Sequence, residues 1–367
     1  MTKIAIVADV HLGYSGRSND IIWALRTIRN YCQANSIDTV VVLGDLFHDR
    51  QHLSIEILCG AYDFFREAKF DYNQQWVAFP GNHDMFLKHS WNINSIRPLG
   101  ELLTIIDTVK ALEIDDRRYW VLPFVYSESA YMRILQRIEK QASKEDVLLT
   151  HVGVNNAIQN VCFLLQRWSM VTFIQSKFDR VYAGHFHLCQ QVGDNLWYPG
   201  SLLPFKFDEG DHDHGFFVFD QDKNEHEFIN ILEQGQLLQP DTVPPPQYCT
   251  FAAELLDEKT EANVRGNVIR IATTRDYTPN EYQEIRNRFA EMGAKKVTFI
   301  NLSDDEAPQA KFVELEPIKI EDLFAKWFDQ DVRGAKDLRR NLAIRLNREI
   351  VDEGNELYSK RADPDAI

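Results

Sequence analysis

Five short apolar runs in the first two hundred residues each end at a polar side chain of a metal-binding type. The runs are Lys3–Ala8, Thr39–Leu43, Gln75–Phe79, Val147–Thr150 and Arg180–Ala183. Segments with helical periodicity separate several of them, namely Asp20–Ala34, Ser54–Lys69 and Ser127–Ala142. Strands that alternate with helices indicate an α/β layered fold. In open α/β sheets the carboxyl ends of the strands gather at one edge, so we expect the five polar segments to converge there.

The residue types in these segments predict a centre for two divalent cations. Carboxylate, imidazole and amide oxygen donors suit Mn²⁺, Fe²⁺ or Zn²⁺, and the lack of thiolates argues against a structural zinc site. Alternate residues at an extended strand end point the same way, so both side chains of D-x-H or H-x-H can reach one ion. Seven ligands exceed the need of one tetrahedral ion, and Asp45, in the middle of the set, is the natural bridge between two. The candidate ligands are Asp9, His11, Asp45, Asn82, His151, His185 and His187.

Packing is the simpler explanation for any one of these motifs taken alone, because a histidine after a strand is usually structural. Five such motifs in order, each at a strand end, are not easily explained by packing. The run Asp211-His212-Asp213-His214 could imitate a metal site as well. Its flanking residues Gly210 and Gly215 favour a solvated turn, and we leave it out of the predicted site.

The order D-x-H, G-D, G-N-H-D, H and G-H-x-H resembles that of the calcineurin-like metallophosphoesterases over the first 240 residues. Within that superfamily, GDLFH followed by GNHD is similar to the meiotic-recombination-eleven nucleases, called SbcD in bacteria, with a phage version among the shorter members. The resemblance implies a four-layer αββα sandwich, followed by a small α/β capping domain and C-terminal partner-binding helices.

The resemblance also implies a role for each site residue. Asp9, His11, Asp45 and His187 would hold one ion, and Asp45, Asn82, His151 and His185 the other. Two Mn²⁺ ions are expected, with Mg²⁺, Fe²⁺ or Zn²⁺ as alternatives. His83 is the family's general acid, and Asp84 is expected to orient its ring by accepting from the other nitrogen. His48 matches the position that steadies the transition state or assists His83; the alternative is an ordinary loop histidine.

Three segments are predicted along the chain: a metallophosphoesterase nuclease domain at 1–240, a DNA-capping domain at 248–316 and a helical partner-binding segment at 317–367. The proline-rich stretch Gln239–Gln247 is the clearest linker. Tyr248–Leu256, Asn267–Thr273 and Lys296–Asn301 are predicted strands around a helix at Pro279–Met292. Candidate DNA contacts in the capping domain are Arg265, Arg270, Arg275, Lys295 and Lys296.

The terminal helices, predicted at Ile320–Asp329 and Gly334–Glu353, carry apolar stripes at helical spacing. The stripes could pack on the chain's own core, but a helix-in-groove contact with a partner fits better. In the family this position binds an SMC-like ATPase of the SbcC type. The family also forms homodimers through helices of the nuclease domain, and we expect a homodimer here. The apolar residues of Ile55–Phe65 and Trp91–Leu103 could serve that interface or the core.

The expected function is a Mn²⁺-dependent DNA nuclease, acting as a double-strand exonuclease and single-strand endonuclease within an SbcCD-type ATPase–nuclease repair complex. The net charge of −15 argues against a simple DNA-binding protein. Either the acidic side chains lie away from the cleft, or a partner supplies part of the DNA affinity. The alternatives are a small-molecule phosphodiesterase or phosphatase of the same superfamily, and a non-catalytic scaffold, against which the complete ligand set argues.

The location expected for this function is the cytoplasm of a bacterium or phage-infected cell. No apolar run is long enough to span a bilayer, and the start, MTKIAIVADVHLG, lacks the layout of a signal peptide. The five cysteines are scattered and odd in number, which is typical of reduced thiols.

Overall fold

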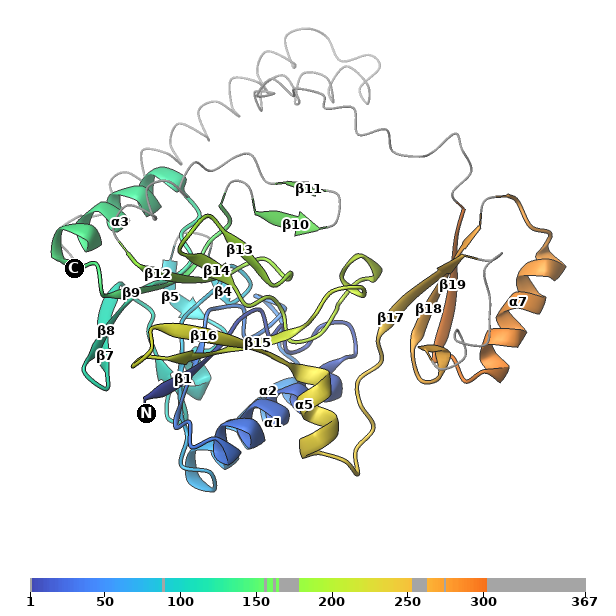
Figure 1. Ribbon diagram of the computed structural model, residues 1–367, viewed down its shortest axis with the longest axis horizontal. Coiled ribbons are helices and arrows are strands. Elements are labelled where there is room, and N and C mark those ends of the chain that lie inside the picture. Colours follow the sequence, from blue (N-terminus) through green and yellow to red (C-terminus); the bar gives the residue numbers. More distant parts are fainter. Residues whose placement is uncertain are drawn as a thin grey trace, which may run out of the picture. The chain divides into compact units, whose positions relative to one another are not determined.

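The structure is a computed structural model, and it describes residues 2–301 except 88–89, 155–156, 161–162, 165–177, 253–262 and 274 (Figure 1). The described residues belong to one compact unit. The predicted C-terminal helices lie outside them, so the segment at 317–367 stays a prediction. Within the described part, every helix is too short or too polar to cross a lipid bilayer. The cysteines described there, Cys32, Cys59, Cys189 and Cys249, are free thiols.

The first of two six-stranded sheets has the order β16-β15-β1-β2-β3-β6. The strands from β1 to β6 in this order run parallel, while β15 is antiparallel to β1 and β16 to β15. Their bounds are β1 Lys3–Val7, β2 Thr39–Val42, β3 Gln75–Ala78, β6 Thr104–Ile105, β15 Gly215–Asp220 and β16 Glu225–Asn230.

The second sheet has the order β13-β14-β12-β9-β8-β7. Its four middle strands are parallel, and the two edge strands are antiparallel to their neighbours. The bounds are β7 Lys110–Ile114, β8 Arg117–Leu122, β9 Val147–His151, β12 Arg180–Gly184, β13 Gln190–Val192 and β14 Leu196–Tyr198.

The two sheets pack face to face and helices cover their outer faces, which gives four layers (Figure 1). A fully buried cluster joins the inner faces, with Ile6 and Val41 from the first sheet and Leu149 and Tyr182 from the second. Because both faces of each central strand are buried, these strands are continuous apolar runs rather than alternating ones. The predicted αββα metallophosphoesterase sandwich is therefore confirmed.

Helices α1 Ser18–Ala34, α2 Ile55–Phe70 and α5 Ile231–Leu238 cover the first sheet, and α3 Glu128–Gln141 covers the second. The starts of α2 and α3 follow from local chemistry. The side chain of Ser54 accepts a hydrogen bond from Ile57 N, and that of Ser127 accepts one from Ala130 N. These caps satisfy amide groups that the first turn of a helix leaves free.

Helix α5 begins directly after strand β16. The strand β16 ends at Asn230, whose side chain accepts hydrogen bonds from Leu232 N and Glu233 N and so starts the helix. The cap interrupts an apolar run that reads as a strand when only its hydrophobicity is considered.

The smaller elements include a separate parallel sheet of β17 Tyr248–Ala252, β18 Val268–Thr273 and β19 Lys296–Asn301, with helix α7 Pro279–Glu291. It has its own core, with Val264, Ile269, Ile271 and Phe289 fully buried. The predicted strands and helix of this small unit are present. Two hairpins, β4 Met85–Leu87 with β5 Ser90–Asn94 and β10 Ile158–Asn160 with β11 Phe163–Leu164, and the 3-10 helices η1 Arg97–Leu99 and η2 Phe207–Glu209 complete the described elements.

Candidate metal centre

The seven predicted ligands converge at one edge of the sandwich. Three of the polar segments follow the parallel strands β1, β2 and β3, and the other two lie at the ends of β9 and β12. Since the two sheets pack face to face, segments from both sheets meet at the carboxyl ends of their strands. The ligands that meet there are Asp9, His11, Asp45, Asn82, His151, His185 and His187.

One group of donors surrounds His11. Its Nε2 atom lies 3.1 Å from Nε2 of His187 and 3.7 Å from Oδ2 of Asp45. Donor atoms of Asp9, His11 and His187 all lie within 4.8 Å of one another. These four side chains are the set that the family resemblance assigns to the first ion.

A second group surrounds Asn82. Its Oδ1 atom lies 3.0 Å from Nε2 of His151 and 2.9 Å from Nδ1 of His185. Oδ2 of Asp45 is 3.5 Å from Nε2 of His151. The same carboxylate oxygen therefore faces both groups, which is the geometry that a bridging ligand needs.

Hydrogen bonds fix which ring nitrogens are free to bind a cation. Nδ1 of His151 lies 2.8 Å from the carbonyl of Leu43 and must donate to it, because a carbonyl can only accept. Nε2 of the neutral ring then presents a lone pair to Asn82 Oδ1 at 3.0 Å. Two acceptors at this distance repel each other unless a cation lies between them. The donor set thus fits two divalent ions on geometric as well as chemical grounds.

Burial shifts the pKa values of the carboxylates and imidazoles in this centre. It raises the pKa of Asp9 well above its ordinary value and that of Asp45 to about 6. Burial also lowers the pKa of His151 and of His185 to about 3, so both imidazoles are neutral, as metal ligands must be. Among the described residues no Lys or Arg forms an ion pair with Asp9 or Asp45. Bound cations would compensate these carboxylates.

His187 differs from the other ligands. Although burial opposes protonation, the hydrogen bond to Glu209 and the charge of Asp9 raise the pKa of His187. Binding of a cation would replace the proton at Nε2 and leave the one at Nδ1, which donates to Glu209.

The backbone at the centre is held in conformations that side chains rarely adopt. Asp9, His11 and Asp45 have φ of 49°, 51° and 54°, and His185 has φ of 112°. Such residues cost on the order of 1–3 kcal/mol each and persist where the surrounding structure enforces them. Their gathering in one place is typical of a functional site.

Close approach explains two glycines next to ligands. A Cβ on Gly81 would lie 2.1 Å from Oδ1 of Asp45, and one on Gly184 would lie 2.4 Å from the carbonyl of Leu43. A side chain at either position would displace the strand end or the bridging carboxylate.

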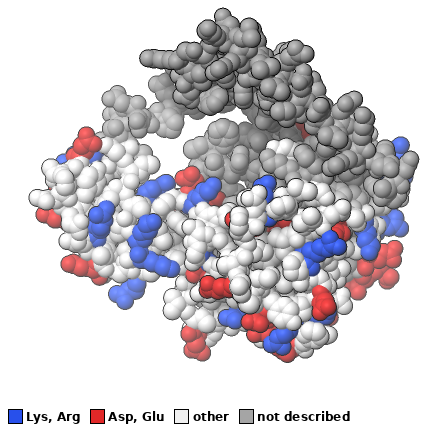
Figure 2. Space-filling view, turned by 180° about the vertical axis from the view of Figure 1, so that it is seen from behind, with Lys and Arg blue, Asp and Glu red and all other residues white. Residues whose placement is uncertain are grey.

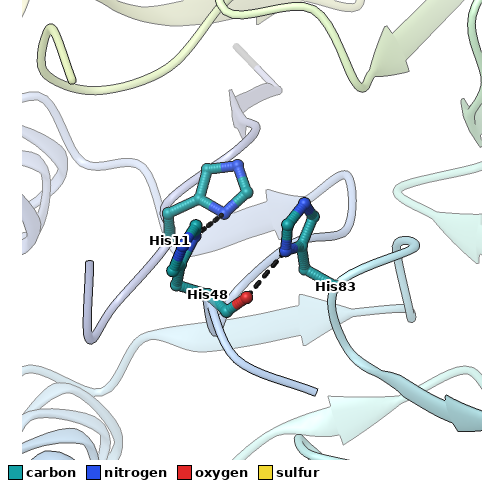
Figure 3. Close-up of side chains that lie close together, drawn as sticks. All are labelled: His11, His48 and His83. Carbon is teal, nitrogen blue, oxygen red and sulfur yellow. Dashed lines mark hydrogen bonds between the residues drawn. The ribbon is translucent and has the colours of Figure 1, made fainter. Parts of the chain in front are cut away.

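His48 and His83 lie beside the ligands (Figure 3). Their rings stack with centroids 5.1 Å apart, and Nδ1 of His48 lies 3.4 Å from Nδ1 of His11. Nδ1 of His83 lies 2.7 Å from the carbonyl of His48, to which it donates. Nε2 of His83 is therefore the atom available for proton transfer. Neither ring is needed for the two groups of ligands.

The predicted contact between Asp84 and His83 is wrong. The buried carboxylate of Asp84 accepts from four other donors, which are Leu46 N, Phe47 N, Gly81 N and the hydroxyl of Ser95. Burial and the charge of Asp45 raise its pKa to about 7. Asp84 holds the loops after β2 and β3 together, and the carbonyl of His48 orients His83 instead.

No sequence motif predicts Glu209, and the prediction for His214 is wrong. Oε1 of Glu209 lies 2.9 Å from Nδ1 of His187, although no motif marks this residue. The run Asp211–His214 was expected to be a solvated turn, and its first three residues are exposed. His214 is instead buried, with Nε2 3.0 Å from the carbonyl of Glu209. Strand β15, which follows directly, is buried along its whole length, so burial of the residue just before it could have been expected.

Comparison with known protein families covers the part of the chain that carries these seven residues. The family model described as calcineurin-like phosphoesterase matches residues 2–189. A protein named as a phosphoesterase, 078R of Invertebrate iridescent virus 3, is 24% identical over 185 residues, which are 47% of this chain. The chain spans about half (50%) of the length of that relative.

Two solved structures are similar in fold. The Plasmodium inner-membrane-complex anchor GAP50 has a TM-score of 0.41 and 11% identity, with 62% of this chain and 88% of that chain covered. A dimetal phosphatase from Danio rerio has a TM-score of 0.36 and 14% identity, with 59% and 91% covered. Both scores are too low to support a conclusion about function. The match at residues 2–189 covers half of the chain and includes all seven converging side chains: the chain belongs to the calcineurin-like phosphoesterase family.

Proposed function

We propose that this phosphoesterase is a Mn²⁺-dependent nuclease that hydrolyses phosphodiester bonds of DNA. The observation that carries the proposal is the stacked pair His48 and His83 beside the ligands (Figure 3). A sugar alkoxide is a poor leaving group and needs a proton as the bond breaks. His83 offers Nε2 for this purpose, because its Nδ1 is already engaged by the carbonyl of His48.

The predicted ligands form two groups, each of which would hold one cation. When bound, two cations would supply Lewis acidity for the phosphoryl oxygens and activation of a water nucleophile. Asp9, His11 and His187 hold one side of the centre, and Asn82, His151 and His185 hold the other. Asp45 faces both sides and also accepts from His83 N at 2.8 Å, which ties the acid to the bridging ligand. A donor set of carboxylate and amide oxygens with imidazole nitrogens, and without thiolates, suits Mn²⁺.

The small unit of β17–β19 and α7 supports a polyanionic substrate. From Tyr248 to Asn301 the chain has eight Lys and Arg and eight Asp and Glu, so this part is neutral while the whole chain carries −15. Figure 2 shows Lys and Arg side chains gathered on one face of it. Two of the candidate DNA contacts are engaged within the chain, since Arg270 pairs with Asp208 and Arg275 with Glu281. Arg265, Lys295 and Lys296 remain the better candidates.

A second function is favoured by the net charge. At −15 the chain repels a polyanion over most of its surface, whereas a small phosphate ester needs contacts with the metal centre alone. A small-molecule phosphodiesterase or phosphatase would use the same ligands.

Digestion of a 3′-labelled linear duplex in the presence of Mn²⁺ separates the two functions. We expect the wild type to release labelled nucleotides, and we expect Asp45→Asn, purified in the same way, to release none. The matched variant excludes a contaminating nuclease. If the wild type leaves DNA intact but cleaves a chromogenic phosphodiester, also after addition of an SbcC-type ATPase and ATP, the nuclease proposal is wrong.

Partners are part of the same proposal. We propose a homodimer and an SbcC-type SMC-like ATPase bound through the segment at 317–367. On α2, Ala61, Phe64 and Phe65 are core residues, but Ile55 and Phe70 are exposed and available for a contact between copies. Sedimentation equilibrium of the full chain is expected to give twice its mass of 42.7 kDa, and a shift to the monomer in Ile55→Ser/Phe70→Ser. A monomeric wild type would contradict the dimer.

A further inference from the structure

A closed circuit of hydrogen bonds surrounds His187. On the side-chain end, its Nδ1 donates to Oε1 of Glu209 at 2.9 Å. On the backbone end, its carbonyl accepts from the amide of Ser201 at 3.0 Å. His214 closes the circuit: its Nε2 is 3.0 Å from the carbonyl of Glu209, to which it can donate, and its Nδ1 is 3.1 Å from the hydroxyl of Ser201, from which it can accept. All of these partners lie within fifteen residues of one another, after the last ligand motif.

The carboxylate in this circuit is rigid. Oε2 of Glu209 accepts from Phe205 N at 2.7 Å while Oε1 faces His187, so both oxygens have a fixed partner. Glu209, His214 and Ser201 are at most 5% exposed. Because an ionised carboxylate can only accept, it holds the proton of His187 at Nδ1. When the ring is neutral, its lone pair is therefore on Nε2, the atom that lies 3.1 Å from Nε2 of His11.

We propose that Glu209 is a positioning residue that sets the direction of His187 in the first metal group, and that Ser201 and His214 hold it in place. A carboxylate behind a ligand histidine fixes the tautomer and the orientation of the ring and raises its basicity. The circuit explains why His214 is buried although its neighbours form an exposed turn. The inference rests on the proposed metal centre, and it adds a residue outside the motifs to it.

Mn²⁺ binding to the full-length protein tests this role by calorimetry. We expect Glu209→Ala to weaken one of two binding steps about 10- to 100-fold and to leave the other unchanged. Glu209→Gln keeps one oxygen but places its NH2 against either Phe205 N or His187 Nδ1, so we expect an affinity between those of Glu209→Ala and the wild type. Asp208→Asn is the matched control, because this neighbouring carboxylate is exposed, pairs with Arg270 and should bind Mn²⁺ like the wild type.

A measurement without metal keeps the two proposals apart. In imidazole ¹⁵N–¹H spectra of the metal-free protein, recorded at a pH at which the ring is neutral, His187 should carry its proton at Nδ1 in the wild type and lose that preference in Glu209→Ala. Unchanged spectra and unchanged Mn²⁺ affinity in a folded Glu209→Ala would overturn the positioning role. A wild type that binds no Mn²⁺ would contradict the metal centre, while the spectra would still decide the role of Glu209.

Discussion

Asp45→Asn is expected to remove phosphoesterase activity while leaving the fold intact. Oδ2 of Asp45 faces His11 of one ligand group and His151 of the other, at 3.7 and 3.5 Å. A neutral amide cannot bridge two cations, so both sides of the centre lose a shared charge. Lewis-acid stabilisation by bound metal contributes several kcal/mol to such reactions, which corresponds to a rate loss on the order of a thousandfold. Steady-state hydrolysis of a chromogenic phosphodiester in Mn²⁺ measures it.

Although Asp45→Asn should remove activity, we expect it to maintain or increase the stability of the metal-free fold. Burial raises the pKa of Asp45 from 3.8 to about 6, so its ionisation disfavours the metal-free fold. The cost is absent below pH 3.8, grows as the pH rises to about 6 and is constant above that. In EDTA at neutral pH, thermal melting should therefore show Asp45→Asn at least as stable as the wild type.

Addition of Mn²⁺ should reverse that order. A ligand that binds only the folded state stabilises it, and the wild type should gain more from Mn²⁺ than Asp45→Asn does. Equal gains in melting temperature for the two proteins would show that Asp45 does not bridge the ions. A variant that melts far below the wild type in EDTA would instead assign Asp45 a structural role.

His83→Ser is expected to slow cleavage of DNA by about 10²- to 10⁴-fold, the usual contribution of a general acid. The metal centre should survive, because His83 contacts Asp45 through its backbone amide, which serine retains. Its side chain is bonded to the carbonyl of His48 and is not among the two groups of ligands. Calorimetry should therefore show Mn²⁺ binding as in the wild type.

The leaving group provides the sharper test of His83. A nitrophenolate leaves without a proton, so hydrolysis of a nitrophenyl phosphodiester should lose much less rate than cleavage of DNA. His52→Ser is the matched control, since His52 is an exposed histidine four residues after His48. Equal losses on both substrates would rule out proton donation and leave His83 a role in binding or positioning.

Much of this centre could be predicted because each predicted ligand lies in a short motif at the end of a strand. Asp9, Asp45 and Asn82 each follow a strand that is a continuous apolar run, and parallel strands bring their carboxyl ends to one edge. The family order of motifs then assigned the ligands to two ions. The alternation of apolar strands and helical segments predicted an α/β layered fold, and the resemblance to the family predicted that it is a four-layer sandwich.

Other parts could not be predicted because partners far apart in the chain compete for the same group. Asp84 was expected to orient its neighbour His83. In the fold, amides of the loop after β2, 37 and 38 residues away in sequence, take its oxygens instead.

The sequence by itself determined which residues form the candidate metal centre and where the strands of the sandwich lie, because both depend on side-chain type and on spacing along a strand. Only the tertiary structure decided how those ligands are oriented. The tautomer of His151 depends on the carbonyl of Leu43, 108 residues away, and that of His187 on Glu209, which no motif marks. A hydrogen bond between distant segments depends on the position of two backbones at once, and that information is absent from either segment alone.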